Sequence, residues 1–361
     1  MKHLFHDMLG EATRLTQGGQ LQAATDMIQR ALREAGAASM PGSVRPDANA
    51  ADDGLVIDVE TRVVGEPKAQ TDDGAEQWLS GSFTHQGRTL AYKLYVPSQA
   101  AGAGAAPRPL LLMLHGCTQN PDDFAAGTRM NTLAREAGML VLYPEQTQPA
   151  NAQKCWNWFK TQHQQRGRGE PALLAALTRK TMAEHGVDAS RVYVAGLSAG
   201  GAMADILGRS HPELFAAVGV HSGLPAGAAA DLPSALAAMR SGAASSQASA
   251  AVCPVIVFHG DADGTVHPAN GQAIVDAARK AQATVGTPQV QSGQAPNGQR
   301  FTQTVHRGAD GRSAIEHWRL HGVGHAWSGG SAAGSYTAPG GVDASAEMLR
   351  FFLSHKRPPA A

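Results

Sequence analysis

The sequence carries no excess of charge of either sign. Lysine and arginine together number 30, as do aspartate and glutamate, so the formal net charge at pH 7 is zero. A protein that binds nucleic acid or an anionic membrane surface usually displays an excess of basic residues. The balance of charge therefore gives no reason to expect such a partner, and we expect a neutral substrate.

Long hydrophobic runs are also missing. No apolar stretch reaches the ~18 residues that a membrane-spanning helix requires. The first residues mix acids and bases and lack the apolar region of a secretory signal. We therefore expect no membrane span, and the lack of a signal favours the cytoplasm.

Cysteine is scarce, which excludes a framework of many disulfides. The chain has three cysteines, Cys117, Cys155 and Cys253, so at least one thiol is free in a monomer. A bridge between Cys155 and Cys253 is one possibility. The interpretation that we favour treats these cysteines as small, buried apolar side chains.

The order of apolar patterns divides the chain into three parts. Residues 1–35 hold two blocks with helical spacing separated by Gly18-Gly19, which predicts a helical hairpin. One hairpin cannot bury its own apolar faces, so it must dock on the main domain, on a second copy of the chain or on a polymer surface. Residues 36–54, rich in Ala, Gly, Pro and Asp, predict a flexible linker, and residues 55–361 form the main domain.

Short apolar runs alternate with helical stretches through the main domain. Residues 83–97 alternate as an antiparallel entry strand would. Later runs are continuous and apolar, as in strands covered on both faces: 110–114, 140–143, 192–195, 216–220 and 255–258. Helical stretches at 172–185 and 269–283 separate some of them. This order predicts an α/β fold with a mostly parallel sheet flanked by helices.

Two segments fit this alternation poorly. Residues 225–251 form an Ala/Ser/Gly-rich insertion with a helix-like centre at 232–239, either a lid or a surface excursion. Residues 284–312 are rich in Gln, Gly and Pro and predict an exposed, mobile loop.

One pentapeptide indicates a catalytic residue. Gly196-Leu197-Ser198-Ala199-Gly200 follows the β-branched run at 192–194 and precedes a small-residue helical stretch. A strand, a sharp turn and a helix around G-x-S-x-G form a nucleophile elbow, which lifts the serine above the sheet. We predict that Ser198 is a nucleophile and that the protein is a serine hydrolase.

A serine nucleophile needs a histidine base and a carboxylate that orients it. The strand at 255–258 leads into a loop that contains Asp261 and Asp263, and we predict Asp263 as the acid. A later strand, 317–320, leads into Gly324-His325, and we predict His325 as the base. Asp261 stays an alternative acid. His317 and His321, on the preceding strand, are expected to be structural.

Acyl transfer also needs donors for the oxyanion. One donor is the backbone N–H of Ala199, directly after the nucleophile. The other is expected after the strand at 111–114, where Gly116 allows the Cys117 amide to point toward the site. Cys117 can fill space with its side chain at the same time.

Several motifs together resemble one family. They are 114–119 (LHGCTQ), 155–159 (CWNWF), 196–203 (GLSAGGAM), 259–263 (HGDAD) and 324–330 (GHAWSGG). In this order they resemble the polyhydroxybutyrate (PHB) depolymerase-type esterases, a group that overlaps feruloyl and acetylxylan esterases. The resemblance implies an α/β-hydrolase fold, a triad of Ser198, Asp263 and His325, and an oxyanion hole made by Cys117 and Ala199. It also keeps secretion open.

Aromatic residues make up only 5% of the chain, yet several lie inside these motifs. Trp156, Trp158 and Trp327 are candidate contacts for an ester chain or a phenolic ring, and His115 is a fourth candidate. The alternative is that the indoles brace the catalytic loops.

The resulting expectation is a two-step ester hydrolysis through an acyl-enzyme on Ser198, with no metal or organic cofactor. The expected substrates are poly(3-hydroxybutyrate), its oligomers and related short-chain esters. A feruloyl or acetylxylan esterase is the alternative. A non-catalytic or acyl-transferring protein whose hairpin binds a partner is a third possibility.

Overall fold

The computed structural model describes residues 75–98, 106–244, 253–282 and 284–357. The helical hairpin predicted at 1–35, the linker at 36–54 and the first residues of the main domain lie outside these ranges. Of the helices in the described ranges, none is long and apolar enough to cross a membrane.

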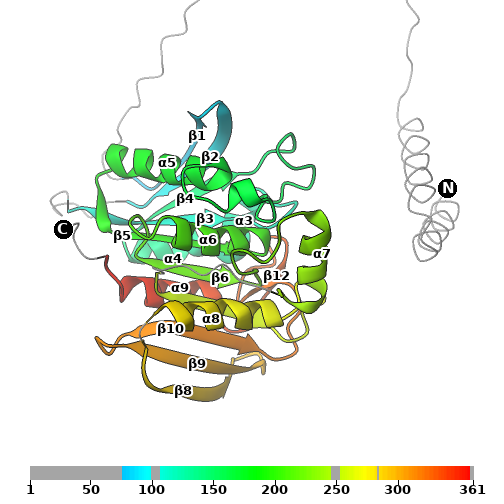
Figure 1. Cartoon of the computed structure of the whole chain (residues 1–361). Coiled ribbons are helices and arrows are strands. Elements are labelled where there is room, and N and C mark those ends of the chain that lie inside the picture. The colour runs from blue at the N-terminus through cyan, green and yellow to red at the C-terminus, as the bar shows by residue number, and fades with distance from the viewer. Residues whose placement is uncertain (1–74, 99–105, 245–252, 283, 358–361) are drawn as a thin grey trace, which may run out of the picture. The chain divides into compact units, whose positions relative to one another are not determined.

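A single large sheet of ten strands organises the described residues (Figure 1). Its strands in chain order are β1 (Gln77–His85), β2 (Arg88–Val96), β3 (Arg108–Leu114), β4 (Leu140–Glu145), β5 (Val187–Leu197), β6 (Ala217–His221), β7 (Val255–Gly260), β8 (Thr284–Gln294), β9 (Arg300–Gly308) and β10 (Ser313–Leu320). Their order across the sheet is β1-β2-β4-β3-β5-β6-β7-β10-β9-β8. From β4 to β10 every neighbouring pair is parallel, and antiparallel pairs extend both edges. The mostly parallel sheet predicted from the sequence is confirmed.

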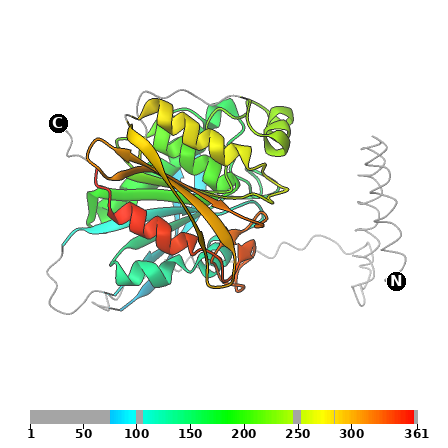
Figure 2. The ribbon, with the colours of Figure 1, turned by 90° about the horizontal axis from the view of Figure 1, so that it is seen from below.

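Helices cover both faces of the sheet (Figure 2). One face carries α5 (Gly169–Glu184), α6 (Ala199–Ser210) and α8 (Ala269–Ala281), and the other carries α3 (Pro121–Thr128), α4 (Met130–Glu136) and α9 (Ala344–Leu353). A 3-10 turn, η1 (Thr161–His163), precedes α5, and a small separate sheet pairs β11 (Trp327–Ser328) with β12 (Thr337–Ala338). This is the α/β-hydrolase arrangement that the sequence predicts.

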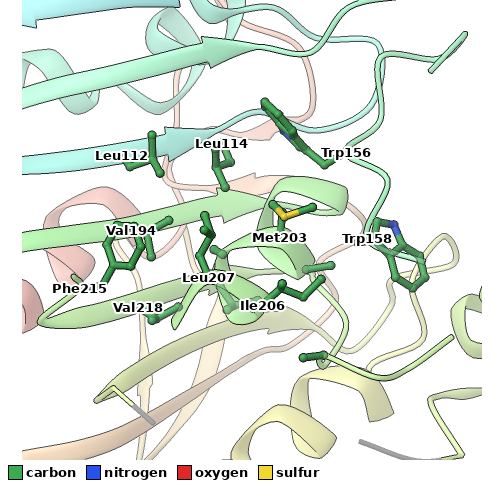
Figure 3. Packing of buried hydrophobic residues seen from close by; sticks show 14 of the residues in the cluster. Leu112, Leu114, Trp156, Trp158, Val194, Met203, Ile206, Leu207, Phe215 and Val218 are labelled. Carbon is green, nitrogen blue, oxygen red and sulfur yellow. The ribbon is translucent and has the colours of Figure 1, made fainter. Parts of the chain in front are cut away.

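Side chains of the central strands point alternately to the two faces of the sheet, and a hydrophobic core lies on each face. In β3, Leu110, Leu112 and Leu114 pack with α5 and α6, whereas Leu111 and Met113 face α4 and α9. Successive side chains of a strand point to opposite faces, so a strand covered by helices on both sides must be apolar at every position. Figure 3 shows the first of these clusters around α6. The buried sheet is therefore a rigid platform for the loops at its carboxyl edge.

The insertion at 225–251 has the helical centre that the sequence predicts. Helix α7 (Leu232–Ser241) begins at a capping box, in which Asp231 accepts from the Ser234 amide and Ser234 bonds back to the Asp231 amide. Such a cap satisfies amides that a helix leaves without intrahelical partners.

The predicted entry strand at 83–97 is wrong in its boundaries. The segment contains the end of β1 and all of β2, joined at Gln86 and Gly87, whose φ angles of 50° and 72° are both positive. Two central turn residues with positive φ match the twist of a tight antiparallel hairpin. The turn therefore lies inside a run that looks continuous in sequence.

The mobile loop predicted at 284–312 is also wrong, because β8 and β9 form an antiparallel extension of the sheet there. The two strands turn at 295–299, and β8 is the outermost strand. Pro288 falls at an irregularity in the register between Val285 and Gln289. Proline is tolerated at bulges and on edge strands, so the composition that suggests a loop is compatible with this strand.

Candidate active site

The nucleophile elbow forms where the sequence predicts it. Ser198 lies between β5 and α6 with φ 57° and ψ −118°, a backbone conformation that non-glycine residues rarely adopt. A Cβ on Gly200 would lie 2.0 Å from the Leu114 oxygen, and one on Gly196 would lie 2.4 Å from the Gly200 backbone. The two glycines let β3, β5 and α6 approach closely enough to hold this turn.

Ser198 is 9% exposed, and its hydroxyl has no hydrogen-bond partner among the described residues. Its amide donates to the His221 oxygen at 2.9 Å. Hydrogen bonds of a catalytic serine are often long before substrate binds, so the free hydroxyl is compatible with a nucleophile.

The predicted acid and base lie in direct contact. Asp263 follows β7, and His325 follows β10, the strand that pairs with β7. Asp263 Oδ2 lies 2.7 Å from His325 Nδ1. An ionised carboxylate can only accept, so Nδ1 donates and Nε2 is left as the basic atom. The His325 side chain is 12% exposed, which leaves it accessible.

Asp263 is held in its ionised form. Burial opposes ionisation, but hydrogen bonds from His259, His325 and the Val266 amide hold the pKa of its carboxyl well below the usual range. Its other oxygen, Oδ1, accepts from the amides of Thr265 and Val266 at 2.9 and 2.8 Å. A carboxylate fixed on both oxygens keeps its charge and its direction toward His325.

The alternative residues form a separate pair. Asp261 Oδ2 lies 2.8 Å from His321 Nδ1, and the Gly322 amide donates to Asp261 Oδ1 at 2.7 Å. His317 is buried, and burial lowers the pKa of its imidazole to about 4. Asp261 is therefore engaged with a different histidine from the one that Asp263 contacts.

The predicted oxyanion loop packs against the elbow. A Cβ on Gly200 would also lie 2.6 Å from the His115 oxygen, so the segment before Gly116 contacts the start of α6. The amides of Cys117 and Ala199 have no hydrogen-bond partner among the described residues. Ala199 is the first residue of α6, where the amides are unpaired and the helix dipole favours negative charge. Both amides are available for an oxyanion.

The disulfide considered from the sequence is wrong. Cys117 is bonded to Cys155, and Cys253 is free and buried. Cys117 and Cys155 follow the carboxyl ends of β3 and β4, whereas Cys253 precedes the start of β7. Opposite ends of a parallel sheet cannot be bridged. The favoured interpretation, that the cysteines are small, buried apolar side chains, holds for Cys253 and is wrong for Cys117 and Cys155, which are bonded to each other.

The four predicted substrate contacts lie beneath the surface. Trp156 Nε1 donates to the His115 oxygen, and Trp327 Nε1 donates to Ser345 Oγ. Trp158 belongs to the same buried cluster as Trp156 (Figure 3). His115 Nε2 accepts from the Gln146 amide, so Nδ1 carries the proton and donates to the Gly116 oxygen at 2.7 Å. These contacts favour the bracing alternative, and direct contact with substrate has no support from their positions.

A buried carboxylate that the sequence analysis missed organises the loop around Cys155. Glu170, near the start of α5, accepts from the Asn157 amide at 2.7 Å and from Gln146 Nε2 at 2.7 Å. Gln146 Nε2 also donates to the Cys155 oxygen. Because Cys155 is bonded to Cys117, the network extends from Glu170 to the predicted oxyanion loop. In sequence Glu170 is an ordinary first-turn acid, so only its burial reveals this role.

His221 is a second residue that the sequence analysis missed. Its oxygen accepts from the Ser198 amide, and its Nε2 accepts from the Ser328 amide at 3.1 Å. Its ring stacks on Phe258 and Trp327, with centroids 5.8 and 5.2 Å away. Burial lowers the pKa of His221 to about 3, so the ring stays neutral. His221 thus connects the elbow to the loop that carries His325.

In the part of the chain that the structure describes, no group of three histidine, cysteine or acidic side chains is arranged to hold a metal ion. The loops at the carboxyl edge of the sheet instead carry a serine with a strained backbone and a histidine that a carboxylate orients. They also carry two backbone amides without hydrogen-bond partners among the described residues. These are the parts that acyl transfer through a serine requires.

Comparison with known proteins agrees with this fold. Poly(3-hydroxyalkanoate) depolymerase C of Paucimonas lemoignei is 30% identical over 260 residues, covering 68% of this chain and 60% of that protein. Feruloyl esterase B of Neurospora crassa is 33% identical over 144 residues, covering 38% of this chain and 47% of that protein. The chain spans about half to three-fifths of the length of these relatives.

A solved acetyl xylan esterase from Aspergillus awamori superposes with a TM-score of 0.53 and 22% identity, covering 70% of this chain and 94% of that one. At that identity the likeness concerns the fold alone. A family model described as Esterase PHB depolymerase matches residues 90–287, more than half of the sequence. This chain belongs to the Esterase PHB depolymerase family.

Proposed function

We propose that the protein hydrolyses carboxylic esters through an acyl-enzyme on Ser198. The observation that carries the proposal is the 2.7 Å contact between Asp263 and His325, on loops at the same carboxyl edge of the sheet as the strained serine. Ser198 attacks the ester carbonyl while His325 takes its proton and passes it to the leaving alcohol. His325 then activates a water that releases the acid and restores the serine.

Each other part of the site has one task in this scheme. The amides of Cys117 and Ala199 stabilise the negative charge that develops on the carbonyl oxygen, and removal of one such donor typically lowers kcat by ~10²-fold to 10³-fold. Asp263 keeps His325 in the tautomer whose Nε2 can accept the proton. The steps need no group beyond these side chains, amides and water.

Among carboxylic esters, we propose poly(3-hydroxybutyrate), its oligomers and related short-chain esters as substrates. The family membership and the similarity to a poly(3-hydroxyalkanoate) depolymerase favour this class. The similarity to a feruloyl esterase favours the alternative, a feruloyl or acetylxylan esterase acting on carbohydrate esters.

A panel of substrates tests both the proposed mechanism and the proposed substrate class. It contains p-nitrophenyl esters, 3-hydroxybutyrate oligomers, amorphous PHB and methyl ferulate, each measured with the wild type and with Ser198→Ala. We expect hydrolysis of the hydroxybutyrate substrates at higher kcat/KM than methyl ferulate, and loss of all activity in the variant. Preference for methyl ferulate would support the alternative, and full activity of Ser198→Ala would contradict the mechanism.

We propose further that the protein works in an oxidising compartment, which differs from the cytoplasmic location expected from the sequence. The Cys117–Cys155 disulfide supports this, since such bonds rarely persist where thiols are kept reduced. A thiol titration of the denatured protein, taken from its native host without reductant, should find one thiol per chain. Three thiols would contradict the proposal.

The predicted hairpin at 1–35 keeps its two proposed roles, docking on the main domain or contact with a second copy or a polymer surface. A truncation that starts near residue 52 separates them. Unchanged oligomeric state and unchanged binding to polymer would exclude the second role.

A further inference from the structure

An exposed aromatic side chain lies next to the candidate active site. Tyr336 directly precedes β12 and is 47% exposed, whereas the tryptophans Trp156, Trp158 and Trp327 are buried. A tyrosine offers a large, stiff apolar ring at a small cost in conformational entropy. An exposed ring in this position therefore needs an explanation.

Tyr336 contacts both loops that carry the proposed chemistry. Its backbone oxygen accepts from the Trp327 amide at 2.7 Å, and Trp327 follows His325 by two residues. Its hydroxyl lies 3.2 Å from Thr118 Oγ1, and Thr118 directly follows Cys117. The ring thus extends from the loop of the base to the loop of the predicted oxyanion donor.

The backbone is strained at both residues of the side-chain contact, Tyr336 and Thr118. Tyr336 has φ 52° and the β-branched Thr118 has φ 65°, values that favour glycine. Neighbouring bonds hold both residues: the Thr118 amide donates to the Gln153 oxygen, and Gln119 Nε2 donates to the Ser335 oxygen. Strained residues of this kind persist where the surroundings fix them, and they cluster at functional sites.

We propose that the ring of Tyr336 contacts the acyl chain of the ester bound at Ser198 and favours acyl groups longer than acetyl. This inference rests on the proposed esterase function. The acyl carbonyl stays in the oxyanion hole through both steps. Gln119 Nε2 donates to the Ser335 oxygen and so fixes the segment of Tyr336 to the oxyanion loop without the hydroxyl, which keeps the ring near the acyl group throughout. The Tyr336 hydroxyl is engaged with Thr118, which leaves the apolar ring surface for the chain.

Tyr336→Gly tests the proposal, because it removes the ring and leaves a residue that adopts positive φ without strain. Burial of one methylene contributes roughly fourfold to kcat/KM. Butyrate is two methylenes longer than acetate, so the ratio of kcat/KM for p-nitrophenyl butyrate over acetate should fall about 15-fold. Tyr336→Phe keeps the ring and should keep the ratio.

Two further variants complete the test. Tyr336→Asn, a side chain that also tolerates positive φ, should give the same result as glycine, and a thermal melt of each variant checks its fold. Trp78→Ala is the matched control. Trp78 is an exposed, hydrogen-bonded aromatic on the edge strand β1, and its loss should leave the ratio unchanged.

The outcomes separate this inference from the proposed function. An unchanged ratio in Tyr336→Gly and Tyr336→Asn, or an equal loss on both esters, would overturn the contact with the acyl chain. A ratio that falls in Tyr336→Phe would assign the effect to the hydroxyl and would also overturn it. Absence of hydrolysis by the wild type would instead contradict the proposed function, and this inference with it.

Discussion

At the scale of single residues, two neighbouring aspartates offer a direct comparison. Asp263 contacts His325 and Asp261 contacts His321, at nearly equal distances of 2.7 and 2.8 Å. They differ in burial, since the Asp263 side chain is fully buried and that of Asp261 is 39% exposed. We propose the buried pair as the acid and base that serve Ser198.

Replacement of each aspartate by asparagine should therefore give different results. Asp263→Asn allows the wrong tautomer of His325, and loss of this kind of orientation lowers kcat by about 10⁴-fold in a known serine protease. Asp261→Asn changes only a partly exposed hydrogen-bonded contact with His321 and should leave kcat nearly unchanged. The measurement is kcat on p-nitrophenyl butyrate for both variants. A larger loss in Asp261→Asn would reverse the assignment of the acid.

Some of these residues could be found from the sequence and others could not. Ser198, Asp263 and His325 each follow a recognisable strand, so local pattern and chain order were enough to choose them. Glu170, His221 and Tyr336 carry no local signal, because burial or contacts between distant loops set them apart. Trp156 and Trp327 lie inside motifs, but membership of a motif does not tell whether a ring is buried or exposed.

At the scale of elements, close packing of β3, β5 and α6 places the nucleophile. The contacts of Gly196 and Gly200 with neighbouring backbone leave no room for a Cβ. Backbone atoms cannot move aside as flexible side chains do, so even one methyl group at these positions must shift an element.

Gly200→Ala should consequently be strongly destabilising, although alanine is the better helix former. Overpacking in a well-packed core costs about 1–3 kcal/mol and occasionally more, and a contact 2.0 Å from the Leu114 oxygen belongs at the upper end. Urea unfolding measures the change in the free energy of unfolding. Gly264→Ala is the control, because a Cβ there meets no atom within 4 Å. Equal stability of the two variants would show that the elbow is not tightly packed.

Strands could be predicted from the sequence where both faces of the sheet are buried. They were harder to predict at the edges of the sheet. The continuous apolar runs of β3 to β7 are recovered because helices cover both faces of those strands. β8 and β9 extend the sheet beyond this core, and many of their side chains are polar. β9 pairs with β10 and β8 pairs with β9, so backbone pairing that composition does not reveal stabilises both strands.

At the scale of the whole molecule, several neutral histidines are buried in the fold. Burial lowers the pKa of His115, His211 and His317 to about 4 and that of His221 to about 3. The ordinary pKa of histidine is about 6.5 in the unfolded chain. Between these values the unfolded state binds more protons than the folded state.

Stability should therefore fall as the pH is lowered from 7 to 5. The free energy of unfolding rises with pH wherever the unfolded state holds more protons, so acid favours unfolding in this window. Asp263 acts in the same direction below about pH 4, because its pKa is lowered in the folded state. Urea unfolding at pH 7, 6 and 5 should give steadily decreasing free energies. A constant or increasing value would show that these histidines are not buried in the neutral form.

Covalent labelling shows directly whether Ser198 is the residue that forms the acyl-enzyme. The protein is treated with a fluorophosphonate, which reacts with activated serines, and the modified site is mapped by mass spectrometry of its peptides. We predict a single adduct on Ser198 that forms as esterase activity is lost and does not form in His325→Ala. An adduct on another residue, or loss of activity with Ser198 unmodified, would contradict the role of Ser198 as the nucleophile.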